Sequence, residues 1–227
     1  LKSLNSFNIS SYAKYFAEFS SEIDLVDLLK HNLLAKEKLF ILGEGSNILL
    51  TKNIDGLLIK NAIKGIKIID ENDNHLIAEV GAGENWHDFV KWSVNQNVSG
   101  IENLALIPGS VGAAPIQNIG AYGMEVKDTI EKVYYIDIKS LEKKDLLRNE
   151  CEFSYRNSIF KNDLKNKIII TKVLFKLNKK HANNYKYGVI EKELNISNQK
   201  PTLETICNTI IKIRTQKLPD PKVLGNS

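Results

Sequence analysis

The segment LIPGSVGAAPIQNIGAYG, residues 106–123, is where this chain leaves the most backbone uncovered by side chains. Glycine and alanine recur through it, and it contains no charged residue. Successive backbone N–H groups in a turn of small residues can form a concave site for an anion. The same composition fits a tightly packed chain crossing equally well, so this segment by itself leaves both interpretations open.

A second small-residue segment, GEGSN at residues 43–47, follows directly after the apolar run LFIL. Taken alone it is typical of an ordinary turn, and it matches neither the dinucleotide fingerprint nor the phosphate loop of nucleoside triphosphatases. Two separate loops that each offer N–H groups do, however, suit a long ligand with a diphosphate. A third glycine turn, GAGENWH at residues 81–87, fits anion binding or a plain helix start capped by Asn85.

Few charged residues near these motifs are candidates for contacting such a ligand. Arg156 lies within FSYRNSIFK, and its guanidinium could pair with a carboxylate or phosphate through two parallel hydrogen bonds. An arginine reaching out from a strand edge is the ordinary alternative. Lys217, in KLPDPK, could contact a diphosphate or be a solvated lysine at a proline-rich helix end. The histidines and cysteines have no metal-ligand spacing, so no metal site is predicted.

Three helices are predicted to position these loops, over residues 20–34, 85–96 and 202–216. In the first of them, the apolar residues at helical spacing are Ile23, Val26, Leu29 and Leu33. Strand-like apolar runs cover residues 39–42, 56–61, 65–70, 75–82, 129–138 and 167–177. Because these runs cluster between helices instead of alternating with them, the predicted fold class is α+β and not a doubly wound sheet.

The composition excludes several classes of protein. The 227 residues are 43% hydrophobic and 26% charged, which is typical of a globular protein. The net charge of +4, with basic and acidic residues interspersed, predicts no nucleic-acid partner. No apolar run is long enough to cross a membrane, and the isolated Cys151 and Cys207 indicate a reducing, cytoplasmic location. The chain begins with Leu1 and stops after LGNS, so we expect it to be part of a longer protein.

Taken in order, these motifs resemble the bacterial UDP-N-acetylenolpyruvoylglucosamine reductase (MurB) family. The matching segments are GEGSN, GAGENWH, ENLALIPGSVGAAPIQNIGAYG, FSYRNSIFK, KLPDPK and GN, which together run over nearly the whole chain. Tyr187 and Gly188 resemble the substrate loop of the longer, first type of this enzyme. Ser110 is a mild departure, since the family commonly has Cys or Thr there.

The resemblance implies a vanillyl-alcohol-oxidase (PCMH) type of FAD-binding fold with two α+β subdomains, consistent with the missing dinucleotide fingerprint. It implies one FAD-binding subdomain at residues 1–64, a second at residues 65–217, and the start of a substrate-binding domain at residues 218–227. The two small-residue loops would hold FAD without a covalent bond. The implied cofactor residues are Gly43, Glu44, Gly45, Ser46, Asn47, Pro108, Gly109, Ser110, Gly112, Ala113, Ala114, Ile119 and Gly120.

The implied reaction is reduction of an enolpyruvyl ether on UDP-N-acetylglucosamine to UDP-N-acetylmuramate, for peptidoglycan synthesis. NADPH delivers hydride to FAD and leaves, and the sugar nucleotide then takes its place. Arg156 is the implied catalytic residue, because a guanidinium suits the enolate that develops at the substrate carboxyl end. Tyr155, Tyr187 and Lys217 are the implied substrate-binding residues. A monomeric cytoplasmic enzyme with a UDP-sugar substrate, and with no nucleic-acid or membrane partner, is expected.

The end of the chain departs from the family pattern. The family continues with Gly-Ser-Phe-Phe-Lys-Asn-Pro, whose Ser is the proton donor, and Ser227 matches the small residue two places before that donor. The donor, a late Glu and nearly all of the substrate domain are therefore expected to be missing, and this chain alone is not expected to complete the reaction.

Two alternatives of other kinds are an FAD oxidase of the same fold and a non-catalytic FAD- or nucleotide-binding module. Such oxidases often tether the flavin through a His near the pyrophosphate loop, and no His lies in residues 43–47 or 106–123.

Overall fold

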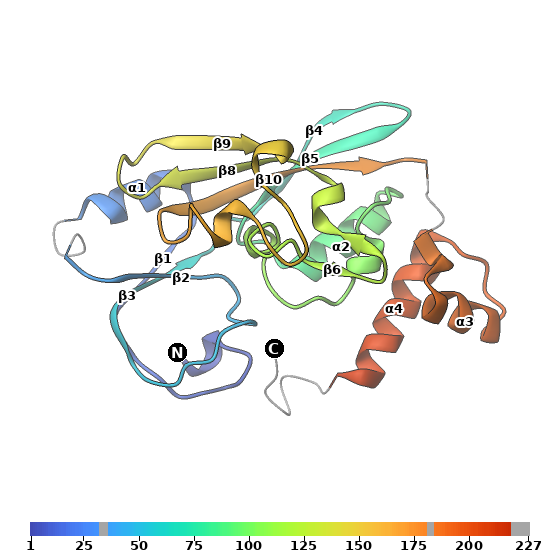
Figure 1. The fold of residues 1–227 in the computed structure, drawn as a ribbon, viewed down its shortest axis with the longest axis horizontal. Coiled ribbons are helices and arrows are strands. Elements are labelled where there is room, and N and C mark those ends of the chain that lie inside the picture. The colour runs from blue at the N-terminus through green and yellow to red at the C-terminus, as the bar shows by residue number, and fades with distance from the viewer. Residues whose placement is uncertain (32–35, 181–183, 219–227) are drawn as a thin grey trace.

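The computed structural model describes residues 1–31, 36–180 and 184–218 and contains two main sheets (Figure 1). The first is a parallel sheet in the order β1-β3-β2, formed by β1 (Ala13–Phe19), β2 (Leu39–Leu42) and β3 (Ile54–Asn61). Helix α1 (Glu22–Lys30) follows its first strand. The central strand β3 is the most buried of the three, which is expected for the strand with a neighbour on each side.

The second sheet is antiparallel and has the strand order β4-β5-β10-β8-β9. Its strands are β4 (Ile66–Glu71), β5 (His75–Gly81), β8 (Ile130–Asp137), β9 (Lys143–Leu147) and β10 (Ile168–Asn178). The long strand β10 lies at its centre and is almost continuously buried. A small hairpin of β6 (Gly120–Ala121) and β7 (Met124–Glu125) stands apart from both sheets.

Helix α2 (Trp86–Asn95) supplies the aromatic centre of the main core. Phe89 lies 4.8 Å from Phe175 of β10 and 5.9 Å from Trp86, measured between ring centroids, and all three rings are fully buried. Burying a side chain of this size contributes about 1.5–3 kcal/mol. Helices α3 (Gly188–Ile196) and α4 (Leu203–Lys217) pack on each other and complete the core through Ile190 and Ile210.

Polar side chains fix where three of the helices begin. Asn85 accepts a hydrogen bond from the N–H of Asp88 at 3.0 Å, and Thr202 accepts one from the N–H of Thr205 at 3.1 Å. Ser21 caps α1 in the same way. Such a cap is worth about 1 kcal/mol, because it satisfies a donor that the helix itself leaves unpaired. The predicted helices at 85–96 and 202–216 are confirmed to within a residue at each end.

The predicted apolar face of the first helix is confirmed for Val26 and Leu29, which pack against buried core residues, and it is wrong for Ile23. Ile23 is 74% exposed, and Leu25, which is fully buried, carries the packing instead. The helix ends at Lys30, and the predicted position Leu33 lies outside the described residues. Strands β1 and β9 were not predicted, because they lie at sheet edges and lack a clean alternation of buried and exposed residues. Helix α3 was not predicted either.

The last strand of the parallel sheet ends at Asn61, and the first strand of the antiparallel sheet begins at Ile66. The predicted subdomain boundary, at residues 64 and 65, lies between them. A second core cluster joins them, in which Ile136 and Ile169 of the antiparallel sheet pack with Leu57 and Ile59 of the parallel one. Glu22 of α1 reinforces this junction by accepting hydrogen bonds from Thr171 at 2.7 Å and Lys143 at 2.8 Å. The domain limits themselves remain predictions, and residues 219–227 lie outside the described part.

Candidate active site

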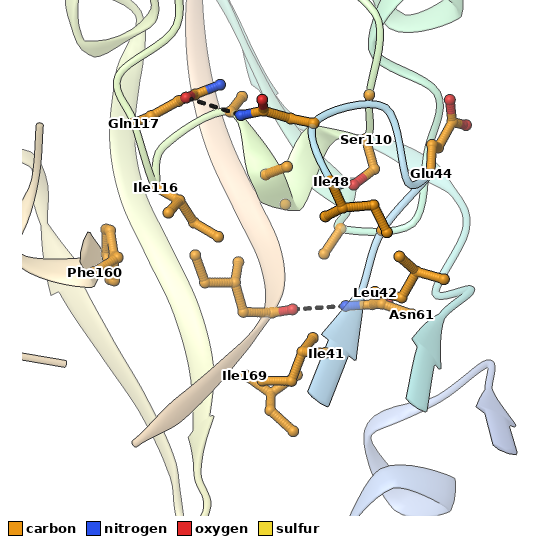
Figure 2. Close-up of a pocket in the computed structure, with 18 of the residues that line it drawn as sticks. Ile41, Leu42, Glu44, Ile48, Asn61, Ser110, Ile116, Gln117, Phe160 and Ile169 are labelled. Atoms are coloured by element: carbon orange, nitrogen blue, oxygen red, sulfur yellow. Dashed lines mark hydrogen bonds between the residues drawn. The ribbon is translucent and has the colours of Figure 1, made fainter. Parts of the chain in front are cut away.

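A cavity of about 540 Å³ lies where the two sheets meet, and both small-residue loops line it (Figure 2). Its volume falls in the range of about 300–1,000 Å³ that ligand pockets occupy. Of the residues predicted to hold the cofactor, Gly120 alone does not line it. Those that do are Gly43, Glu44, Gly45, Ser46, Asn47, Pro108, Gly109, Ser110, Gly112, Ala113, Ala114 and Ile119.

The two loops approach so closely that larger residues would collide between them. A Cβ atom on Gly43 would lie 2.6 Å from the Ser110 hydroxyl oxygen, and one on Gly109 would lie 3.2 Å from the Ser46 hydroxyl oxygen. Gly109 also has a φ of 123°, which L side chains rarely adopt. The Asn47 amide adds a hydrogen bond of 3.3 Å to Gln117. Gly43 and Gly109 therefore let the two loops approach closely, and at Gly109 the backbone conformation itself favours glycine.

The loops keep several backbone donors unused. Within the described residues, no group accepts a hydrogen bond from the N–H of Glu44, Gly45, Ser46, Asn47, Gly109 or Ser110. By contrast, the N–H groups of Val111 and Gly112 donate to the carbonyls of Glu84 and Ala82, at 2.9 and 2.8 Å. The loop is thus anchored at one end and offers open donors at the other, which is the arrangement that an anion-binding turn requires.

The other end of the cavity is apolar. Side chains from both sheets line it, among them Ile41 of β2 and Ile169 of β10 (Figure 2). Lys161 and Lys165 add positive charge on one side. No sequence motif marks this half of the cavity, because each contributor is an ordinary strand or loop residue that only the packing of the two sheets brings together.

The cavity therefore fits FAD, which combines a charged diphosphate with flat, largely apolar ring systems. One end supplies unpaired N–H donors and the other supplies apolar walls. Of the described histidines, His31, His75 and His87, none lines the cavity.

The glycine turn at residues 81–87 has a supporting role. A Cβ on Gly83 would lie 2.8 Å from the backbone of Ala62, and Asn85 caps α2, so the plain helix-start interpretation is confirmed. The Asn85 amide also donates to the Glu44 carboxylate at 2.8 Å. Burial of Glu44 raises the pKa of its carboxyl group, although this hydrogen bond opposes the shift.

Arg156 lies in a tight turn and not at a strand edge. Ser154 and Asn157 exchange two backbone hydrogen bonds across this turn, at 3.1 and 3.2 Å. The Arg156 guanidinium donates to the carbonyl oxygen of Gly120 at 2.6 Å, which brings it to the glycine-rich segment. Tyr155 beside it is 82% exposed.

The two other predicted substrate residues lie in different surroundings. Tyr187, just before α3, packs edge-on against Tyr122 at 5.8 Å between ring centroids and close to Gly123, at the end of the glycine-rich segment. Lys217 is exposed at the last turn of α4 and does not line the cavity. One turn earlier, Arg214 donates to the Leu106 carbonyl at 3.3 Å, a contact that the motifs did not predict.

Other chemistry is limited in the described residues. Burial raises the pKa of the Cys151 thiol to about 12 and that of Cys207 to about 11, so both are protonated at neutral pH. In the described ranges there is no group of three or more His, Cys, Asp or Glu residues placed to hold a metal ion. No helix there is both long enough and apolar enough to span a membrane.

The fold and the site define a flavoprotein domain of two α+β parts with the cofactor cavity between them. Residues 13–139 match the family model of an FAD binding domain. Cholesterol oxidase from Brevibacterium sterolicum has the same type of fold, with a TM-score of 0.52 over 77% of this chain and 36% of its own, at 12% identity. The predicted PCMH-type FAD-binding fold is thus confirmed.

The chain belongs to the UDP-N-acetylenolpyruvoylglucosamine reductase family. It is 50% identical to that enzyme from Flavobacterium johnsoniae, over 100% of this chain and 67% of the relative, and 43% identical to the Bdellovibrio bacteriovorus enzyme, over 100% and 68%. The MurB structure from Thermus caldophilus has a TM-score of 0.64 at 22% identity, over 88% of this chain and 69% of its own.

Proposed function

We propose that this protein carries out the FAD-dependent, NADPH-using reduction of UDP-N-acetylenolpyruvoylglucosamine to UDP-N-acetylmuramate in peptidoglycan precursor synthesis. The observation that carries the proposal is the hydrogen bond from Arg156 to Gly120, which directly follows the last residue of the glycine-rich segment that lines the cavity, Ile119. Bound FAD supplies the ability to accept hydride from NADPH and to pass it to the enolpyruvyl double bond.

The two small-residue loops are proposed to bind the diphosphate of FAD. Their unpaired N–H groups supply directed donors, and their lack of side chains lets the ligand approach the backbone. The apolar end, with Ile41 and Ile169, is proposed to cover the less polar part of the cofactor. Glu44 is proposed to act mainly by fixing the first loop, because Asn85 holds its carboxylate.

Arg156 is proposed to stabilise the negative charge that develops on the substrate. Hydride addition to the terminal vinyl carbon leaves negative charge on the neighbouring carbon, and this charge delocalises into the attached carboxylate as an enolate until a proton adds to that carbon. A fixed guanidinium would stabilise the enolate oxygens through paired hydrogen bonds. Its hydrogen bond to Gly120 uses one guanidinium nitrogen, and an arginine has further N–H groups for the substrate.

Tyr155, Tyr187 and Lys217 are proposed to bind the sugar nucleotide. The exposure of the Tyr155 ring and the place of Tyr187 beside Gly123 support this for the two tyrosines. We further propose a cytoplasmic, monomeric enzyme with no nucleic-acid partner. The two buried free thiols support the cytoplasmic location, and the low net charge supports the lack of a nucleic-acid partner.

The decisive experiment separates the two half-reactions in the full-length enzyme by anaerobic stopped-flow absorbance. In Arg156→Lys, flavin reduction by NADPH should stay within a few-fold of wild type, while reoxidation by the enolpyruvyl substrate should slow by about 100-fold or more. Arg148→Lys is the matched control, because Arg148 is half-exposed and its one ion pair among the described residues is with Asp128 at 3.8 Å. Wild-type reoxidation in Arg156→Lys would exclude the proposed role of Arg156.

A further inference from the structure

Asn118 is a fully buried amide within the glycine-rich segment, two residues before the Gly120 carbonyl that binds Arg156. Its Nδ2 group donates to the Ser154 carbonyl at 2.9 Å. Its Oδ1 atom accepts from the backbone N–H of Lys127 at 3.1 Å. One side chain therefore connects the glycine-rich segment with both the turn that carries Arg156 and the segment that follows β7.

The turn that carries Arg156 needs such support. Arg156 has a φ of 52°, in the left-handed region that residues other than glycine rarely occupy. A conformation of this kind costs on the order of 1–3 kcal/mol and persists only where its surroundings hold it. The Ser158 hydroxyl, which is also buried, donates to the Ile116 carbonyl at 2.7 Å. The turn is thus held at one end by Asn118 and at the other by Ser158.

We propose that Asn118 is a positioning residue for the substrate half-reaction and that it acts by holding the Arg156 turn against the glycine-rich segment. This inference rests on the proposed function of Arg156. Asn118 does not line the FAD cavity, so its loss should leave cofactor retention intact. A displacement of a catalytic group by about 1 Å can slow a reaction about 100-fold. Without Asn118, substrate-dependent flavin reoxidation should slow by about 10- to 100-fold.

Two variants at Asn118 test the proposal in the full-length enzyme. Asn118→Ala removes the hydrogen bonds to Ser154 and Lys127 and the contact with the Glu125 carboxylate, and it introduces no charge. Asn118→Asp keeps the acceptor for Lys127 but replaces the donor to Ser154 with a carboxylate, so the alanine variant carries the test if the aspartate variant does not fold. Ser99→Ala is the control, because it removes one buried hydrogen bond, to the Asn178 carbonyl at 3.1 Å, at another place in the fold. FAD content, flavin reduction by NADPH and flavin reoxidation by the enolpyruvyl substrate are measured for each.

Only a positioning role predicts the results of two further measurements. Hydrogen exchange at the amides of Ser154 and Asn157 should become faster in both Asn118 variants and stay unchanged in Ser99→Ala. In an Arg156→Lys background, Asn118→Asp should slow reoxidation by less than threefold more, because the two residues act through one group.

The outcomes separate this inference from the proposed function. Wild-type reoxidation in both Asn118 variants, unchanged exchange at the turn, or a fully multiplicative effect in the double variant would overturn the role of Asn118. If Arg156→Lys alone reoxidises normally, the proposed function of Arg156 fails, and the role of Asn118 fails with it. If Arg156→Lys is slow but the Asn118 variants are normal, only the role of Asn118 fails.

Discussion

Replacing Gly43 by alanine tests whether the two small-residue loops meet as the structure has them. The new Cβ atom would lie 2.6 Å from the Ser110 hydroxyl oxygen, whereas ordinary van der Waals contact begins at 3.4 Å. Gly43 does not have a φ in the left-handed region, so alanine fits its backbone and the collision is the main effect. Either the loops separate by several tenths of an ångström or the hydroxyl rotates away.

The expected size of the effect follows from this overlap. Overpacking costs about 1–3 kcal/mol where the loops must separate, and it costs less where the Ser110 hydroxyl, the end of a rotatable side chain, turns away. For a protein of this length, each kcal/mol lowers the melting temperature by about 2–4 °C, so Gly43→Ala should lower it by about 2–12 °C. Because the shifted loops also lose their alignment toward the cavity, the affinity for FAD should fall in parallel.

A second substitution makes the prediction specific to this contact. The Cβ of Ser110 lies 3.6 Å from the same position, which is an ordinary contact, so Gly43→Ala combined with Ser110→Ala no longer collides. No hydrogen bond from the Ser110 hydroxyl is present among the described residues, so Ser110→Ala alone should change stability by less than about 1 kcal/mol. The double variant should therefore be more stable than Gly43→Ala.

Thermal and urea unfolding of the wild type, the two single variants and the double variant, with and without FAD, measures the coupling free energy between residues 43 and 110. We expect at least about 1 kcal/mol of rescue. Strictly additive effects, with the double variant no more stable than Gly43→Ala, would refute the predicted overpacking and would show that the Ser110 hydroxyl leaves the contact at little cost.

Two further predictions concern the same cavity. Gly109→Ala and Gly65→Ala should both be less stable than wild type because of backbone strain, since the φ values of the two glycines are 123° and 115°. Only Gly109→Ala should bind FAD more weakly in a fluorescence titration, because Gly109 lines the cavity, whereas nothing lies within 4 Å of a Cβ on Gly65. Equal FAD affinity in the two variants would contradict the role of Gly109. Glu44→Gln should be more stable than wild type at pH 7 and lose this advantage as the pH falls below about 4.5. Burial raises the pKa of Glu44 in the folded state, so the protonated carboxyl group favours folding below the unfolded-state pKa, and this contribution to stability is lost as the pH rises and the group ionises. Urea unfolding across pH 3–8 checks this, and a pH-independent difference would contradict it.

The small-residue segments marked the polar half of the site as a candidate, and the resemblance of the whole set of motifs to one family made it a prediction of cofactor residues. Residues 43–47 and 106–123 could be recognised because anion-binding turns need small residues, and that requirement is written locally in the chain. The helices at 85–96 and 202–216 were likewise predictable, since each carries its own cap and its own apolar periodicity. Arg156 was singled out by its motif, although the residues around it left its surroundings open.

Tertiary structure decided what these segments do together. Ile41 and Ile169 are ordinary strand residues until the two sheets pack and make them opposite walls of one cavity. Gly43 faces Ser110 and Arg156 reaches Gly120 only because distant segments of chain are brought into contact. Leu25 replaced Ile23 as the buried residue of α1 because the position of the neighbouring sheet, and not helical spacing, selects which side of a helix is covered. Local sequence therefore determined the turns and caps, whereas contacts between residues far apart in the chain, which no local pattern encodes, determined the cavity and the place of Arg156.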